Sequence, residues 1–148
     1  MKIYLDTCCY NRPFDDQGQM KIRLESISKL FIQSKIRENV FELVWSFMLD
    51  LENDENPNFD SKENIQGWKD TSKEFCDFHE DIREKANSIE KYGIKSKDAL
   101  HIACAISSNC DFFITTDKVV LNKNNKINEL EIINPIDFVR LWSENNED

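Results

Sequence analysis

The sequence has little of what breaks or links a chain. Only three glycines and three prolines occur in 148 residues, and there is no Gly/Ser-rich stretch or internal repeat. We therefore expect one domain over residues 1–148. No apolar run approaches the ~20 residues of a membrane-spanning helix. The first apolar run stops at Asp6 without the pattern of a secretory signal. These absences predict a cytoplasmic protein with no membrane association.

Cysteine and histidine are placed too sparsely for a structural zinc site. The five cysteines form no CxxC pair, and neither His79 nor His101 lies at ligand spacing from a pair of them. In a reducing compartment we expect the cysteines to be small buried side chains rather than disulfide partners.

Positive charge is scarce, because 28 Asp and Glu residues outnumber 19 Lys and Arg residues and give a net charge of −9. This balance differs from the basic character of a typical nucleic-acid-binding protein. It fits a carboxylate cluster that binds divalent cations, or a partner that supplies positive charge. Part of the excess lies in acidic stretches at residues 50–60 and 143–148, and we expect the second to be a flexible tail.

What the sequence does contain is an alternation of strand and helix patterns. Short β-branched or aromatic runs predict strands at 2–5, 41–45, 75–78, 111–115 and 130–133. Apolar spacing predicts helices at 19–37, 46–52, 80–92 and 96–108, a helix opened by a capping box at Asp60, and a last helix from Pro135. Such alternation is typical of an α/β protein whose mostly parallel central sheet is covered by helices.

Four acidic residues stand where such a sheet has its ligand-binding edge. Asp6 and Asp117 each follow a predicted strand. Glu52 and Asp98 lie in helices that begin near the same edge. Four carboxylates brought together repel one another unless a cation separates them, and Mg²⁺ prefers such oxygen ligands while keeping several waters. One or two such ions support phosphodiester hydrolysis.

These acids belong to a set of short motifs that resembles the PIN domain family, in particular its VapC-like bacterial and archaeal subgroup. The motifs are Leu5-Asp6-Thr7, the pair Ser46 and Glu52, Lys97-Asp98-Ala99-Leu100-His101-Ile102-Ala103, and Thr115-Thr116-Asp117. The resemblance implies a three-layer α/β/α domain, Mg²⁺ or Mn²⁺ as cofactor, and endonucleolytic cleavage of an RNA substrate. It also implies the toxin of a toxin–antitoxin pair, bound by a small antitoxin protein, and a homodimer.

Carried over residue by residue, the resemblance implies catalytic and metal-binding roles for Asp6, Glu52, Asp98 and Asp117. Asp6 and Asp98 would contact the metal directly. Glu52 and Asp117 would bind it through water or orient the attacking water. The supporting residues would be Thr7, Ser46 and Thr116, and the candidate substrate contacts are Asn11 and Arg12, which could meet a phosphate.

Three of these acids have an ordinary structural interpretation when each is taken alone. Asp6 can end a strand at a turn, and Asp98 can favour the first turn of a helix. Asp117 can cap a short helix at residues 118–121.

The remaining acid, and the function itself, also have alternatives. Asp50 rivals Glu52, but the two point about 200° apart on a helix, so only one can face the site. His101 shares a helical face with Asp98, where a hydrogen-bonded structural histidine is an alternative to a general base. A HAD-type phosphatase would need an aspartate at position 8, which is Cys8. The main alternative to a nuclease is a catalytically silent PIN-like module for binding or assembly.

Overall fold

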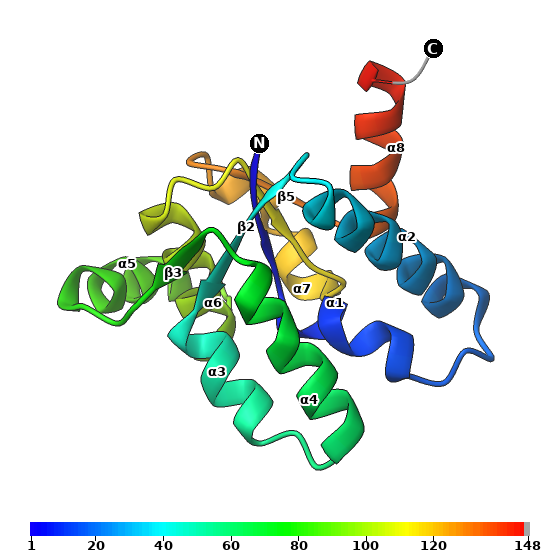
Figure 1. Ribbon diagram of the computed structural model, residues 1–148. Helices are drawn as coiled ribbons and strands as arrows, with labels where there is room; N and C mark the ends of the chain where they lie inside the picture. The colour runs from blue at the N-terminus through cyan, green and yellow to red at the C-terminus, as the bar shows by residue number, and fades with distance from the viewer. Residues whose placement is uncertain (147–148) are drawn as a thin grey trace.

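The computed structural model describes residues 1–146, which form a five-stranded sheet with helices around it (Figure 1). The strands are β1 (Lys2–Leu5), β2 (Glu42–Ser46), β3 (Glu74–Cys76), β4 (Phe112–Ile114) and β5 (Glu131–Ile133). Every pairing is parallel, and the strands lie in the order β3-β2-β1-β4-β5. The predicted α/β fold with a parallel central sheet is confirmed.

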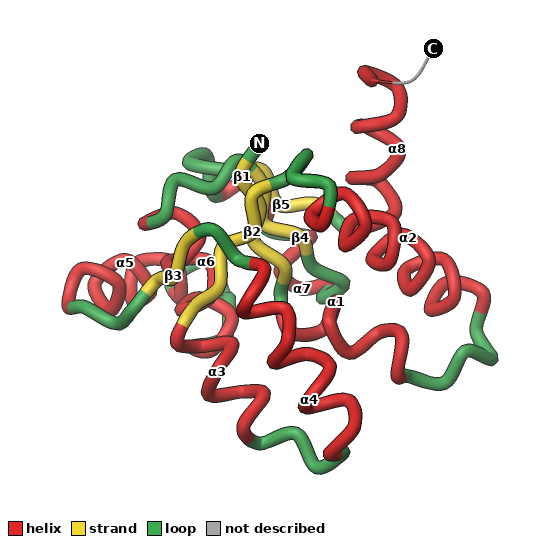
Figure 2. Tube along the Cα trace, in the orientation of Figure 1, coloured by secondary structure: helices red, strands yellow, loops and turns green. Residues whose placement is uncertain are grey.

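Two groups of helices enclose the sheet. The longer helices are α2 (Met20–Arg37), α5 (Glu80–Glu90), α6 (Ser96–Ser107) and α8 (Pro135–Asn146). Figure 2 shows the strands between the α5–α6 pair on one side and the α2–α8 pair on the other. The shorter helices are α1 (Thr7–Asn11), α3 (Phe47–Asp54), α4 (Phe59–Gly67) and α7 (Lys118–Leu121). Because α1, α3 and α7 each begin shortly after a strand ends, they lie at the carboxyl edge of the sheet.

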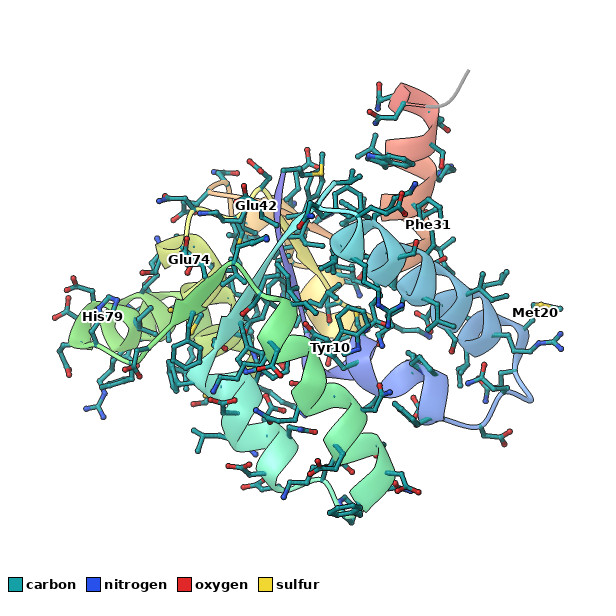
Figure 3. The ribbon with its side chains drawn as sticks, in the orientation of Figure 1. Tyr10, Met20, Phe31, Glu42, Glu74 and His79 are labelled. Atoms are coloured by element: carbon teal, nitrogen blue, oxygen red, sulfur yellow. The ribbon has the colours of Figure 1, made fainter. Side chains whose placement is uncertain are left out.

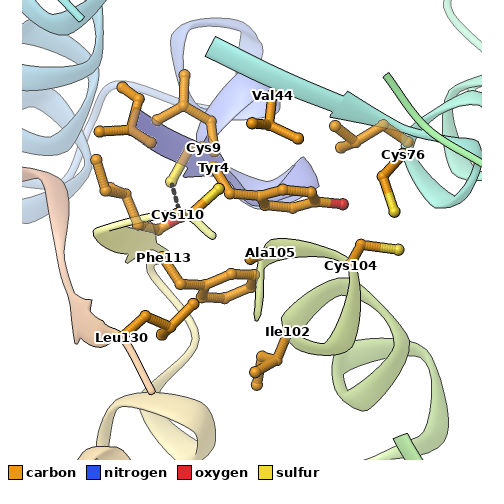
Figure 4. Close-up of a cluster of buried hydrophobic side chains, with 14 of the residues drawn as sticks. Tyr4, Cys9, Val44, Cys76, Ile102, Cys104, Ala105, Cys110, Phe113 and Leu130 are labelled. Atoms are coloured by element: carbon orange, nitrogen blue, oxygen red, sulfur yellow. Dashed lines mark hydrogen bonds between the residues drawn. The ribbon is translucent and has the colours of Figure 1, made fainter. Parts of the chain in front are cut away.

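The central strand β1 is apolar from residue 3 to residue 5 because both faces of the sheet are covered there. All three side chains of residues 3–5 are fully buried. In the interior, the ring of Tyr4 stacks on Phe113 of β4 with centroids 5.4 Å apart, and Ile102 of α6 belongs to the same cluster (Figure 4). All five cysteines are free thiols. Four are buried as expected, whereas Cys8 is half-buried.

The strand order decides where a ligand can bind. Tyr4 of β1 pairs with Val44 of β2 on one side and with Phe113 of β4 on the other. From β1 the chain continues to one side of the sheet, and from β4 it continues to the opposite side. Such a reversal opens a crevice at the carboxyl ends of the two strands. The residues that follow Leu5 and Ile114 therefore lie at this crevice.

One helix was not predicted, and another begins at a different residue. α1 and the 3₁₀ turn Arg12–Phe14 occupy a segment to which no element was assigned. α4 has Asn58 as its N-cap, with a side chain that accepts a hydrogen bond from the Ser61 N–H at 2.9 Å. The capping box predicted at Asp60 is therefore wrong. The remaining 3₁₀ turns are Trp68–Thr71 and Asn124–Lys126.

The acidic tail predicted at residues 143–148 begins inside a helix. α8 continues through Asn146, so residues 143–146 are helical. Residues 147–148 lie outside the described part of the chain, and the flexibility of the tail stays a prediction. Within residues 1–146, no helix has the length and apolar character that a membrane span requires.

Candidate active site

Asp6 is held firmly at the end of β1. It is 5% exposed, and its carboxylate accepts hydrogen bonds from the Thr7 N–H at 2.8 Å and the Thr115 hydroxyl at 2.7 Å. The first bond caps α1, so Asp6 has a structural role whatever else it does. The hydroxyl beside Asp6 comes from Thr115, whereas the sequence motif favoured Thr116. Both belong to one Thr-Thr pair, and only the path of the chain after β4 decides which side chain turns toward β1.

The structure separates the two acids of α3 that competed for the second position. Asp50 accepts a hydrogen bond from the indole N–H of Trp45 at 2.8 Å and forms an ion pair with Lys69 at 3.0 Å. Glu52 instead contacts the imidazole of His101 on α6. Glu52 is therefore the acid of α3 that faces the crevice, as its offset from the N-cap residue predicted.

His101 links β1, β2 and α3 at this edge, and its side chain is buried. Its Nδ1 lies 2.5 Å from the hydroxyl oxygen of Tyr4, which in turn lies 2.6 Å from Oγ of Ser46. On the other side of the ring, Nε2 contacts Glu52 and lies 4.0 Å from the Asp6 carboxylate. Ser46 also caps α3 by accepting a hydrogen bond from a backbone N–H, which confirms its predicted place. The interpretation of His101 as a hydrogen-bonded residue is confirmed, while the part played by Tyr4 was not predicted.

Burial and charge shift the pKa values of His101 and Glu52 in opposite directions. Burial disfavours the imidazolium form, but the hydrogen bond that His101 donates to Glu52 and the charge of Asp6 outweigh it and raise the pKa of His101. Burial likewise disfavours the carboxylate of Glu52, but the hydrogen bond and charge of His101 outweigh it and lower the pKa of Glu52. The pair therefore favours an imidazolium beside a carboxylate.

Asp98 lies in the first turn of α6, where neighbouring acids oppose its charge. Burial, and then the negative charges of Asp6 and Asp117, raise the pKa of Asp98 to about 6. Glu52 adds to the same effect. Asp98 therefore lies near the other three acids predicted from the sequence.

Asp117 follows β4 and caps α7. Its Oδ1 accepts hydrogen bonds from the N–H groups of Val119 and Val120 at 2.9 and 3.1 Å. The capping interpretation is therefore confirmed. Residues 1–146 supply no hydrogen bond to its second oxygen, which is available to a ligand.

The chemistry of these donors fits a hard divalent cation. The set is dominated by carboxylate oxygens, and the raised pKa of Asp98 reflects a concentration of negative charge that a cation would relieve. Within the described part of the chain, no three His, Cys, Asp or Glu side chains are grouped so as to hold an ion together. Mg²⁺ commonly takes one or two carboxylates and completes its shell with water, so the residues fit such an ion without a three-ligand cage.

A cavity flanks the crevice on each side. One, of about 490 Å³, contains Thr7 and Glu52 in its wall together with Asn11 and Phe14. The second, of about 430 Å³, includes Thr116, Asp117, Lys21 and Lys118 among its lining residues.

Arg12 forms part of the wall of the second cavity, but its guanidinium is already engaged. Nε pairs with the buried Glu25 at 3.0 Å, and Nη1 pairs with Asp15 at 2.8 Å. Arg12 therefore has a structural role in binding Glu25 and Asp15. Of the two candidate phosphate contacts, only Asn11 has a side chain without a hydrogen-bond partner among residues 1–146.

The all-parallel α/β sheet, with acidic residues at its switch point, is a PIN-like arrangement. The sequence model for the PIN domain matches residues 3–126. The chain belongs to the PIN domain family, whose members are typically metal-dependent nucleases.

Among solved structures, the chain is similar to one in the crystal structure of VapBC2 from Rickettsia felis bound to a DNA fragment from their promoter. The TM-score is 0.55 at 16% identity, and the match covers 90% of this chain and 98% of that chain. At this identity the likeness shows the fold alone, and it confirms the predicted PIN-like arrangement. No curated protein matches the chain.

Proposed function

We propose that this PIN domain is a metal-dependent endoribonuclease that hydrolyses RNA phosphodiester bonds at Asp6, Glu52, Asp98 and Asp117. The observation that carries the proposal is the place of these acids at the carboxyl edge of the sheet. Asp6 caps α1, Asp117 caps α7, and Glu52 contacts His101 on the helix that carries Asp98. The upward shift in the pKa of Asp98, caused by burial and by the charges of Asp6 and Asp117, supports it. Structural acids usually have a basic partner of their own, whereas Asp98 has no ion pair among residues 1–146 and is opposed by the charges of neighbouring acids.

Asp6 and Asp98 are the residues that we assign to direct contact with Mg²⁺ or Mn²⁺. Such an ion, when bound, would activate water and stabilise the leaving oxygen. Glu52, held by His101, orients water on one side, and the free oxygen of Asp117 does so on the other. The Thr115 hydroxyl holds the carboxylate of Asp6 in place through its hydrogen bond.

The cavity beside Asp117 suits the backbone of the substrate. Lys21 and Lys118 line it, and both are exposed. Two ammonium groups there would attract a phosphate and partly offset the acids, in a chain whose net charge is −9. We assign them to the phosphodiester backbone, which carries no sequence information by itself.

We further propose that the chain is a toxin controlled by a small antitoxin protein and that it forms a homodimer. The similar fold in the VapBC2 crystal structure supports a partner of this kind. So does α2, which exposes the apolar side chains of Met20, Leu24, Ile27 and Leu30 along one face. Met20 projects outward at the end of the helix in Figure 3. An RNA target and five free thiols favour the cytoplasm as its location.

The test is cleavage of a panel of single-stranded and structured RNAs with Mn²⁺, with EDTA, and with three variants. We expect cleavage with Mn²⁺ only. Glu52→Gln should lower kcat/KM by about 10- to 100-fold, and Asp98→Asn should lower it further. Asp50→Asn is the matched control, because it removes a charge from the same helix away from the crevice, and it should cleave normally. Equal cleavage in EDTA, or a fully active Asp98→Asn, would contradict the proposal.

A catalytically silent binding module is the second candidate, and two observations favour it. No three potential ligands are grouped within residues 1–146, and Glu52 is already paired with His101. Absence of cleavage by the wild-type protein, with Mn²⁺ binding that Asp98→Asn leaves unchanged, would decide for this module.

A further inference from the structure

The cavity beside Glu52 has a preformed floor. It lies where the segment α1 to Phe14 faces the turn between α3 and α4. Three asparagines at the end of α3 and in that turn are used in internal hydrogen bonds. Asn53 donates to the Lys62 carbonyl at 2.9 Å, Asn56 donates to the Ser61 hydroxyl at 3.1 Å, and Asn58 caps α4. These bonds fix the turn, so the cavity does not depend on a ligand to form.

Three other side chains of the wall have binding capacity left over. The ring of Phe14 is 48% exposed. The amide of Asn11 can both donate and accept, and it finds no hydrogen-bond partner within the described residues. Glu55 is exposed at the end of α3, and residues 1–146 supply its carboxylate with no ion pair. The lining of the cavity thus includes an aromatic face, an amide and a carboxylate.

The charge of the wall selects against phosphate. Asp15, Glu52 and Glu55 all line the cavity, and no lysine or arginine is among its lining residues in the described chain. A neutral, planar ligand with N–H donors matches such a wall, because carboxylates accept from amino groups and aromatic rings stack on heteroaromatic faces. The volume of about 490 Å³ lies within the ~300–1,000 Å³ of small-molecule sites.

We propose that this cavity is a nucleobase subsite that takes one unpaired base of the RNA, stacked on Phe14 and hydrogen-bonded by Asn11 and Glu55. The proposal rests on the proposed function, since the cavity shares Thr7 and Glu52 with the candidate active site. The base must be unpaired, because a base inside a duplex offers neither a free face nor a free pairing edge. Glu55 favours bases that carry an amino group over uracil.

The test is binding of fluorescently labelled single-stranded A6, C6 and U6 oligoribonucleotides, followed by anisotropy with Ca²⁺ in place of Mn²⁺. We expect A6 and C6 to bind more tightly than U6. Phe14→Ala should weaken binding by about 5- to 150-fold, the range for loss of one stacked base. Phe14→Trp should restore it, and Glu55→Gln should narrow the preference for A6 and C6 over U6.

Phe59→Ala is the matched control. Phe59 is 72% exposed on α4 and is not part of the cavity wall, so its loss should leave binding unchanged. Equal binding by Phe14→Ala and Phe59→Ala would overturn the proposal, as would failure of the wild-type protein to bind any of the oligonucleotides.

Cleavage separates the two proposals. If the wild-type protein cleaves RNA with Mn²⁺ but Phe14→Ala has the same KM and the same products, the nuclease stands and the base subsite fails. If binding depends on Phe14 but no RNA is cleaved, the base subsite stands and the nuclease fails.

Discussion

Lys29 should make the stability of the protein depend on pH. Its amino group is buried, and no carboxylate is among the groups that shift its pKa. It is 1% exposed on α2, with Nζ 5.5 Å from the ring centroid of Tyr10 and 5.8 Å from that of Trp68 (Tyr10 is labelled in Figure 3). Burial, opposed by Cys9 and assisted by the charge of Arg37, lowers the pKa of Lys29 from 10.5 to about 7. The folded protein therefore loses this proton well before the unfolded chain does.

The direction of the pH dependence follows from the number of protons that the folded and unfolded states bind. Between pH 7 and pH 10.5 the unfolded chain holds a proton that the folded protein has released, so the free energy of unfolding rises with pH across this window. For pKa values of about 7 and 10.5, the gain between pH 6 and pH 8.5 is about 2 kcal/mol. Below pH 6 both states are protonated, and the contribution is flat.

The assay is urea unfolding followed by tryptophan fluorescence at pH 6.0, 7.0, 7.75 and 8.5. The wild-type protein should gain about 2 kcal/mol relative to Lys29→Met over this range. Lys21→Met, which removes an exposed lysine from the same helix, should follow the wild-type curve. A hydrogen bond with Cys76, followed by burial, raises the pKa of Cys104, and burial raises the pKa of Cys110 to about 12. These thiols occur in every variant and cancel in the difference. Parallel curves for the wild type and Lys29→Met would refute the reasoning.

Three further predictions concern stability, each measured as a change in the urea midpoint. Arg12→Ala leaves the buried Glu25 without its partner and should cost about 3 kcal/mol or more; a loss under about 1 kcal/mol would show that the pair contributes little. Tyr4→Phe removes two buried hydrogen bonds and should cost about 1–3 kcal/mol, and an unchanged midpoint would contradict those bonds. Asn58→Ala should cost about 1 kcal/mol and Asp60→Ala less than half of that, since Asn58 is the cap of α4; the reverse order would restore the capping box.

The strand ends could be predicted from the sequence because a buried strand appears as an apolar run that ends at a polar residue. A parallel strand covered on both faces must be apolar throughout, so the acid that ends it marks the carboxyl edge of the sheet. Asp6 after residues 2–5 and Asp117 after residues 111–115 show this pattern, and both lie at the predicted edge. Helix geometry implied that only one of Glu52 and Asp50 can face the site, and the offset of Glu52 from Ser46 decided between them.

The contacts among distant segments could not be predicted in this way. Tyr4 is an ordinary apolar residue within β1, and nothing near it in sequence signals its bonds to Ser46 and His101, which are 42 and 97 residues away. α1 was missed for a different reason. It is only five residues long, too short for a periodic pattern, and it depends on a cap from Asp6 rather than on its own propensity.

The segment from Asn11 to Phe14 separates the two cavities. Asn11 and Phe14 line the cavity beside Glu52. Arg12, which lies between them in sequence, lines the cavity beside Asp117, together with Lys21 and Lys118. Arg12 is held by its ion pairs with Glu25 and Asp15, so the segment is fixed to α2 rather than free to fold over a ligand. In the nuclease that we propose, the four carboxylates would supply chemistry that is the same for every substrate. Changes in this short segment would then alter which base the proposed subsite accepts without touching those carboxylates.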